Sequence, residues 1–205
     1  MSTPLKERGW FSIVFMFSLT AIASAILIML AGLTRQRVDA NQKLSFERSV
    51  LEAVGETVPK GASGIEVNKI YNLRVKDTVV AKDTFLVYHA SDSTLSYIIP
   101  LSGAGFWDKI SGVIALAPDR RTVIGISFYQ QNETPGLGGE IMKPYFKNQF
   151  KGKKLAESGI PIELRPVGAP LDSSSVEAIT GATQTSTRLM KFVNARLDAW
   201  RRSAK

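Results

Sequence analysis

Hydroxyl side chains crowd one short segment in the last eighth of the sequence. The segment reads Thr180-Gly181-Ala182-Thr183-Gln184-Thr185-Ser186-Thr187, and the pattern of an amphipathic helix follows it. Glycine lets the backbone turn sharply, and the first amide N–H groups of a helix have no acceptor within the helix. Such a helix start binds an anion without a basic side chain, so a hydroxyl there is well placed to carry or contact a phosphate. The alternative interpretation is an ordinary Ser/Thr-rich N-cap.

A second segment carries three glycines in four positions. It reads Asn132-Glu133-Thr134-Pro135-Gly136-Leu137-Gly138-Gly139-Glu140, between a strand-like run and an expected helix. Three such glycines cost much chain entropy, which favours a loop that presses its backbone against a flat ligand. Leu137 would be an exposed apolar contact there. Glu133 and Glu140 are candidate general bases, metal ligands or hydrogen-bond acceptors for a heterocycle.

A third segment combines two glycines with two aromatic side chains. It reads Gly103-Ala104-Gly105-Phe106-Trp107-Asp108. The glycines allow close backbone approach and the aromatic rings offer flat surfaces, although a turn with two core aromatics is the alternative. The one histidine, His89, lies in a strand-like run away from the glutamates, so we predict no metal site. The sequence has no cysteine, which excludes disulfides and thiolate metal sites within this chain.

Together the three segments resemble the covalent FMN-binding domain of bacterial membrane redox pumps, over residues 103–202. The pattern is most similar to the C-subunit family of the sodium-translocating NADH:quinone oxidoreductase. The family's attachment signature is Asp, two variable residues, Ser or Thr, Gly, Ala, and an acceptor Thr or Ser. Here it reads Glu177-Ala178-Ile179-Thr180-Gly181-Ala182-Thr183, with Glu in place of Asp. Residues 133–138 match the family's flavin-facing loop in full.

The resemblance implies a covalent FMN, with its phosphate joined to the hydroxyl of Thr183. A magnesium-dependent flavin transferase that uses FAD would make the attachment outside the cytoplasm. The implied cofactor-binding residues are Thr180, Gly181, Ala182, Thr183, Thr185, Trp107, Glu133, Thr134, Pro135, Gly136, Leu137 and Gly138. A tethered, exposed flavin suits electron transfer, which accounts for the absence of a recognisable catalytic acid–base pair.

The resemblance therefore predicts a membrane-anchored flavoprotein subunit that relays electrons in an ion-translocating NADH:quinone oxidoreductase. Its partners would be the other subunits of that complex, the flavin transferase and the lipid bilayer. One alternative is the related G subunit of the Rnf complex, which serves ferredoxin and NAD but usually has Gly-Gly where this chain has Phe106-Trp107. The others are a stand-alone extracytoplasmic flavin carrier and a non-redox anchored interaction domain.

An uncharged run of 24 residues from Trp10 to Leu33 predicts a transmembrane helix. At the helical rise it spans about 36 Å, more than the hydrocarbon core of a bilayer. A secretory signal is the alternative, but the run continues past the small triplet Ala23-Ser24-Ala25. Basic residues flank both ends, so the positive-inside rule does not decide the orientation. The family implies a single-pass protein of the bacterial inner membrane with its FMN domain in the periplasm.

The remaining pattern predicts one α+β domain behind the single transmembrane helix, with a mostly antiparallel sheet and flanking helices. We divide the chain into a tail (1–9), a transmembrane helix (10–33), a connecting helix (34–60) and an FMN-binding domain (61–205). The expected strands are 70–75, 84–89, 95–101, 112–116, 122–129 and 162–167. A short helix is expected at 140–150 and a terminal helix with Leu189, Val193, Leu197 and Trp200 on one face. The formal charge is +8, but we find no nucleic-acid-binding motif and predict no such partner.

Overall fold

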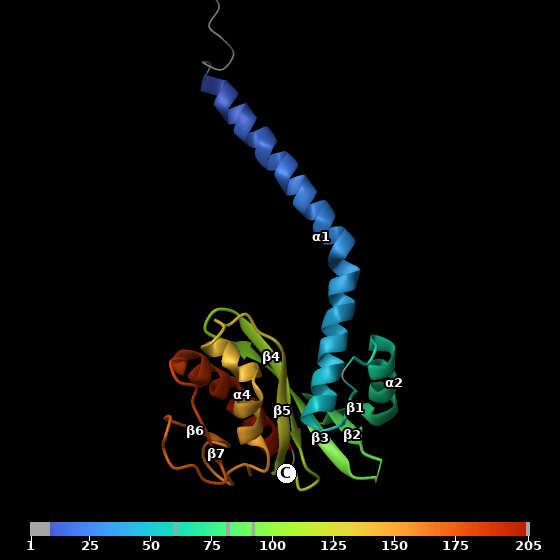
Figure 1. Ribbon diagram of the computed structural model, residues 1–205, viewed down its shortest axis with the longest axis vertical. Helices are drawn as coiled ribbons and strands as arrows, with labels where there is room; N and C mark the ends of the chain where they lie inside the picture. Colours follow the sequence, from blue (N-terminus) through green and yellow to red (C-terminus); the bar gives the residue numbers. More distant parts are fainter. Residues whose placement is uncertain (1–8, 60, 81–82, 92, 204–205) are drawn as a thin grey trace, which may run out of the picture. The chain divides into compact units, whose positions relative to one another are not determined.

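The computed structural model describes residues 9–59, 61–80, 83–91 and 93–203. The chain forms two compact units, one ending at Lys43 and the other beginning at Leu44. A single helix, α1 (Gly9–Ala53), belongs to the first unit up to Lys43 and to the second unit after it (Figure 1).

The described part of the first unit is α1 up to Lys43, and it is apolar from Trp10 to Leu33. In that range its large side chains are exposed, except for the half-buried Phe11. In the described part of the chain this is the one helix that is long and apolar enough to cross a membrane. The helix continues without a break to Ala53. A connecting helix is expected over residues 34–60, and the helix in the structure ends within that range. The boundaries of the four regions stay a prediction.

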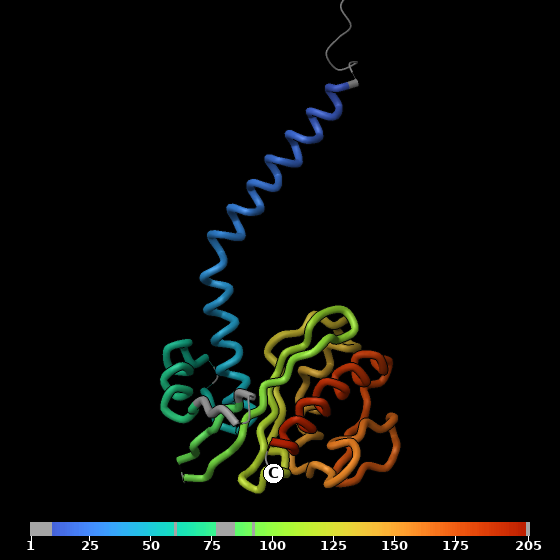
Figure 2. Tube along the Cα trace, turned by 180° about the vertical axis from the view of Figure 1, so that it is seen from behind, coloured from blue at the N-terminus to red at the C-terminus, as the bar shows by residue number. Residues whose placement is uncertain are grey.

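The second unit is built on a five-stranded antiparallel sheet with the strands in sequence order. The strands are β1 (Val75–Val80), β2 (Asp83–His89), β3 (Leu95–Ala104), β4 (Lys109–Leu116) and β5 (Val123–Gln130). Helix α4 (Thr183–Ser203) packs on one face, and the end of α1 with α2 (Gly64–Arg74) covers the other (Figures 1 and 2).

Successive strand residues point to opposite sides of the sheet, and apolar residues on both sides are buried. Ile99 and Ile114 pack with Leu189 and other apolar residues of α4. Their neighbours Ile98 and Val113 pack on the opposite side with the last turns of α1. The expected α+β class and the buried face of α4 are confirmed.

A long connection links β5 to α4 through short elements. These are η2 (Gly138–Met142), α3 (Pro144–Lys147), η3 (Asn148–Phe150), β6 (Glu163–Arg165) and β7 (Ser175–Glu177). Strands β6 and β7 pair in parallel. The helix expected at 140–150 is thus broken into three pieces. Pro144, which has no backbone N–H to continue a preceding helix, occupies the first position of α3.

The strand expected at 70–75 is wrong. Those residues up to Arg74 belong to α2, and β1 begins only at Val75. A capping box starts this helix: the Glu66 N–H donates to Ser63 Oγ at 3.3 Å, and the Ser63 N–H donates to Glu66 Oε2 at 2.7 Å. The Ser-x-x-Glu spacing is the sequence signal that indicates this helix start.

Glu52 joins the end of α1 to two other elements of the second unit. Its carboxylate accepts a hydrogen bond from Ser127 Oγ at 2.6 Å and forms an ion pair with Lys147. Burial raises the pKa of Glu52, but the hydrogen bonds from Lys147 and Ser127, together with the positive charges of Lys147 and Lys151, lower it by more. The net pKa therefore lies below the ordinary value of 4.5.

Glu52→Gln should destabilise the protein at neutral pH and make its stability less sensitive to acid. A carboxyl whose pKa is lowered on folding contributes stability above its unfolded pKa, and this is lost as pH falls through the folded pKa. The loss at pH 7 should stay below about 1 kcal/mol because the side chain is half exposed. Thermal unfolding from pH 7 down to pH 3 should show the variant and the wild type converging. An equal difference at all pH values would contradict this, and Glu157→Gln, in an exposed ion pair with Arg121, is the matched control.

Candidate functional site

The hydroxyl-rich segment and the two glycine-rich segments of the sequence meet around a cavity of 340 Å³. The β3–β4 turn, the loop after β5 and the start of α4 each contribute part of the wall. The lining residues are Phe106, Trp107, Glu133, Thr134, Leu137, Gly138, Gly181, Ala182, Thr183, Gln184 and Thr185. Segments that are far apart in the sequence are therefore adjacent here, as a single ligand site would require.

The four hydroxyl side chains at the start of α4 differ in their surroundings. Thr185 is buried, and its Oγ1 donates to Glu133 Oε2 at 2.6 Å. Ser186 is fully buried, and its Oγ accepts the N–H of Ile179 at 3.1 Å. Thr187 is exposed but does not line the cavity.

Thr183 is the one of these four hydroxyl residues that is both exposed and part of the cavity wall. It is the first residue of α4, where helix geometry leaves amide N–H groups without acceptors within the helix. Among the described residues, none forms a hydrogen bond with its hydroxyl. This oxygen is therefore accessible for modification and lies where an anionic group is stabilised.

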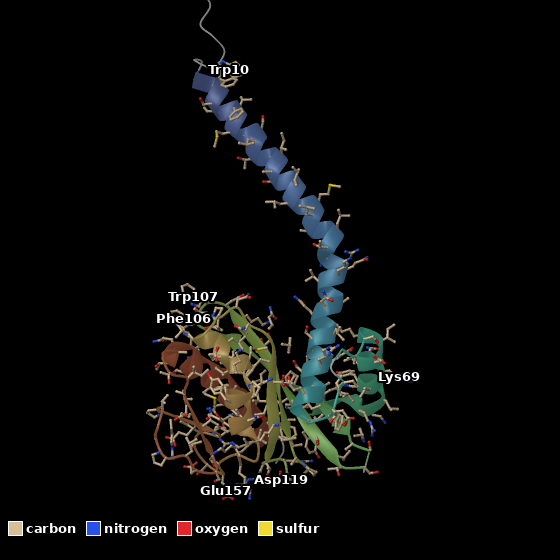
Figure 3. All side chains as sticks on the ribbon, in the orientation of Figure 1. Trp10, Lys69, Phe106, Trp107, Asp119 and Glu157 are labelled. Carbon is tan, nitrogen blue, oxygen red and sulfur yellow. The ribbon has the colours of Figure 1, made fainter. Side chains whose placement is uncertain are left out.

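Two aromatic side chains stand at the rim of the cavity instead of in the core. Trp107 is 68% exposed and Phe106 is 46% exposed. Their rings meet edge to face with centroids 5.2 Å apart, and the Arg188 guanidinium lies 5.7 Å from the Phe106 centroid. Figure 3 shows both residues at the opposite end of the second unit from Asp119 and Glu157. They offer flat apolar surface to a ligand in the cavity.

Leu137 connects the loop after β5 to the start of α4. It is 43% exposed, and a Cβ on Gly181 would lie 3.0 Å from its Cδ2 atom. Gly181 has a φ of +72° and Gly136 a φ of +76°, which L side chains rarely adopt. Gly181 therefore lets Leu137 approach the start of α4, whereas a Cβ on Gly136 would meet nothing within 4 Å and glycine serves there for its backbone conformation.

Glu133 has a structural position that the sequence did not indicate. Its Oε1 accepts the N–H groups of Phe106 and Trp107 at 2.9 and 3.0 Å. Its Oε2 accepts the Thr185 hydroxyl, and only 4% of the residue is exposed. Both oxygens face protein donors, which disfavours the roles of general base and metal ligand. Within the described residues, no group of three or more His, Asp or Glu side chains could hold a metal ion.

Three of the predicted site residues lie outside this cavity. Thr180 and Gly136 line a separate cavity of 370 Å³ with Glu140 and Glu177, and Pro135 lines neither. Glu140 accepts the Tyr145 hydroxyl at 3.3 Å, and Glu177 accepts the N–H of Gly168. The signature residue Glu177 therefore holds the loop before β7 and does not line the cavity of Thr183.

Two lining residues were not among the predicted site residues. Phe106 precedes Trp107, and Gln184 follows Thr183 at the helix start. Their membership in the same glycine-rich and hydroxyl-rich segments is the signal that could have included them. The other nine predicted residues are brought together: Trp107, Glu133, Thr134, Leu137, Gly138, Gly181, Ala182, Thr183 and Thr185.

Comparison with known proteins places this cavity within a described domain family. Residues 105–198 match the model of the FMN-binding domain. The C subunit of the Na+-translocating NADH-quinone reductase of Haemophilus ducreyi is 30% identical over 221 residues, covering 87% of this chain and 84% of that protein. The C subunit of the same reductase from Vibrio vulnificus strain YJ016 is 42% identical over a shorter stretch of 98 residues, 46% of this chain and 38% of the relative.

Solved structures agree with this assignment. The crystal structure of the C subunit of the Na+-translocating NADH-quinone reductase from Parabacteroides distasonis gives a TM-score of 0.68 at 29% identity, covering 81% of this chain and 94% of that one. Shewanella oneidensis NqrC gives a TM-score of 0.60 at 22% identity, over 81% and 100% of the two chains, which shows a shared fold. The chain therefore belongs to the FMN-binding C-subunit family of the Na+-translocating NADH-quinone reductase.

Proposed function

We propose that this chain carries FMN on Thr183 through a phosphoester and relays electrons as the C subunit of a Na+-translocating NADH:quinone reductase. The observation that carries the proposal is the accessible Thr183 hydroxyl in the cavity wall at the first residue of α4. The buried hydroxyls of Thr185 and Ser186 are held by internal hydrogen bonds and make poorer acceptors for the flavin phosphate.

The residues of the cavity fit the two chemically distinct parts of FMN. Amide N–H groups at the start of α4 and the helix dipole would stabilise the phosphate. Trp107, Phe106 and Leu137 would provide apolar surface for the ring system. When bound, the flavin supplies the electron-transfer chemistry, while the protein sets its position and electrostatic surroundings. The exposed rim supports exchange of electrons with a partner protein more than reaction with an enclosed substrate.

The similarity to C subunits of the Na+-translocating NADH-quinone reductase supports the proposed role in an electron-transfer complex. The native complex provides the test of this role. Purification of the full chain from its native membrane in mild detergent should recover companion chains of an NADH:quinone reductase. Addition of NADH to that complex should bleach the visible absorbance of the covalent flavin, and quinone should restore it. Recovery with ferredoxin-linked companions would favour the Rnf alternative. A covalent flavin that stays oxidised during NADH turnover would contradict the relay.

We further propose that the apolar part of α1 anchors the chain in the inner membrane, with the FMN domain outside the cytoplasm. Arg35 and Arg37 would then follow the helix across, which large domains tolerate because they translocate largely regardless of charge. Alkaline phosphatase fused after Lys205 should be active in intact cells, and an export-sensitive fluorescent protein at the same position should stay dark. The reverse result would place Thr183 on the cytoplasmic side, away from the proposed site of attachment.

A further inference from the structure

The carboxylate of Glu133 is the shared acceptor of the segments that form the cavity. It takes two backbone N–H groups from the β3–β4 turn and one hydroxyl from α4. Its own backbone N–H donates to Gln131 Oε1 at 2.6 Å, which holds the loop after β5. Two of these partners are backbone N–H groups, which can only donate, and hydrogen bonds of this kind favour the ionised carboxylate as their acceptor.

Two glycines leave the space that this carboxylate occupies. A Cβ on Gly105 would lie 2.4 Å from Glu133 Oε1, and a Cβ on Gly138 would lie 2.8 Å from Oε2. The same Cβ on Gly138 would lie 2.5 Å from Thr185 Oγ1. Any side chain at either glycine would displace the carboxylate from its donors, so the three segments are fitted around it.

The buried charge is balanced by dipoles and not by a cation. Across the described ranges, Glu133 has no ion-pair partner. The nearby Arg188 turns to other groups: its Nη1 donates to the Gly105 carbonyl at 3.4 Å, and its guanidinium lies over the Phe106 ring. A charge with little screening by water acts more strongly on neighbouring groups than an exposed one. Glu133 therefore keeps a negative potential in the wall of the cavity.

We propose that Glu133 is a positioning residue that fixes the Phe106–Trp107 turn against α4 and, through its buried charge, lowers the reduction potential of the flavin in the cavity. This rests on the proposed function, because it needs the flavin beside Glu133. Adding electrons next to a fixed negative charge is unfavourable, and the charge is held in place because its donors come from two segments, the β3–β4 turn and α4, that are distant in sequence from Glu133. The side chain thus sets the driving force for the electron relay without taking part in any proton transfer.

Glu133→Gln separates the charge from the hydrogen bonds. The amide oxygen can still accept the N–H groups of Phe106 and Trp107, and the amide N–H₂ can donate to Thr185 Oγ1, whose hydroxyl then turns away. The full-length variant, made together with a flavin transferase, should fold, carry covalent flavin at the wild-type level and be reduced more easily. We expect the reduction equilibrium to shift by about tenfold, which is about 59 mV for a one-electron step. Spectroelectrochemical titration of the holo-protein measures it.

Two further variants control the interpretation. Glu140→Gln removes the same charge from η2, outside the cavity of Thr183, and should shift the equilibrium less than about twofold. Thr185→Val removes one donor and leaves the charge in place, so the potential should stay equal to the wild type or fall. A raised potential in Thr185→Val would contradict the assigned role of the charge.

The outcomes separate this inference from the proposed function. A wild type without covalent flavin would overturn the proposed function before any potential is measured. A flavinylated Glu133→Gln variant with a wild-type potential would overturn the inference alone. Failure of Glu133→Gln to fold would also contradict the inference, because the amide can satisfy all three partners of the carboxylate.

Discussion

Thr183→Ala is expected to abolish covalent flavin while leaving the fold intact. The exposed side chain makes no hydrogen bond with the described residues, so its removal costs little stability. The variant would lose the oxygen that forms the phosphoester. Fluorescence of the denatured band on a gel, compared with a wild type made beside the transferase, should fall to background. Circular dichroism and thermal unfolding should match the wild type.

Two matched variants make this loss specific. Thr183→Ser keeps an oxygen at the same helix position and should retain the fluorescent band. Thr187→Ala removes another exposed hydroxyl of α4, outside the cavity, and should also retain it. A fluorescent band in Thr183→Ala would show that another residue carries the flavin.

Expression without a flavin transferase should yield a folded, colourless protein. Joining free FMN to a hydroxyl would release water, which is unfavourable in aqueous solution. With FAD as donor, the bond between its two phosphates breaks as the new phosphoester forms, and AMP leaves. The visible spectrum of the purified full chain should therefore lack a flavin band, and co-expression of the transferase should restore it. Covalent attachment after incubation with FMN alone would contradict an enzymatic origin.

The sequence pattern was sufficient to predict the α+β class, the successive strands β4 and β5, and the buried face of α4. These features depend on local periodicity and on turn residues, which a single sequence displays. The end of α2 has the apolar pattern of a strand from Ile70 to Val75, but the capping box at Ser63 and Glu66 starts a helix that runs to Arg74. Local start signals and apolar runs compete there, and the cap determined the structure.

The candidate site was predictable as three segments but not as a set of contacts. The resemblance to the FMN-binding domain family implied that the three segments contribute to one site. It did not show that Glu133 faces inward to two backbone N–H groups and Thr185, because those donors lie 26 or more residues away in the sequence. Nor did it show that Thr180 lines a different cavity from Thr183. The left-handed backbone at Gly181, between these two threonines, marks the point where the chain turns from one cavity to the other.

The mass of the proteolytic peptide that contains Thr183 tests the central claim most directly. The full chain should be made beside the transferase, purified and digested, and its flavin-containing peptide should be sequenced by tandem mass spectrometry. We predict one peptide heavier by FMN less one water, with fragment ions that place the added mass on Thr183. An unmodified Thr183 peptide, or the same mass placed on Thr180, Thr185, Ser186 or Thr187, would contradict the account.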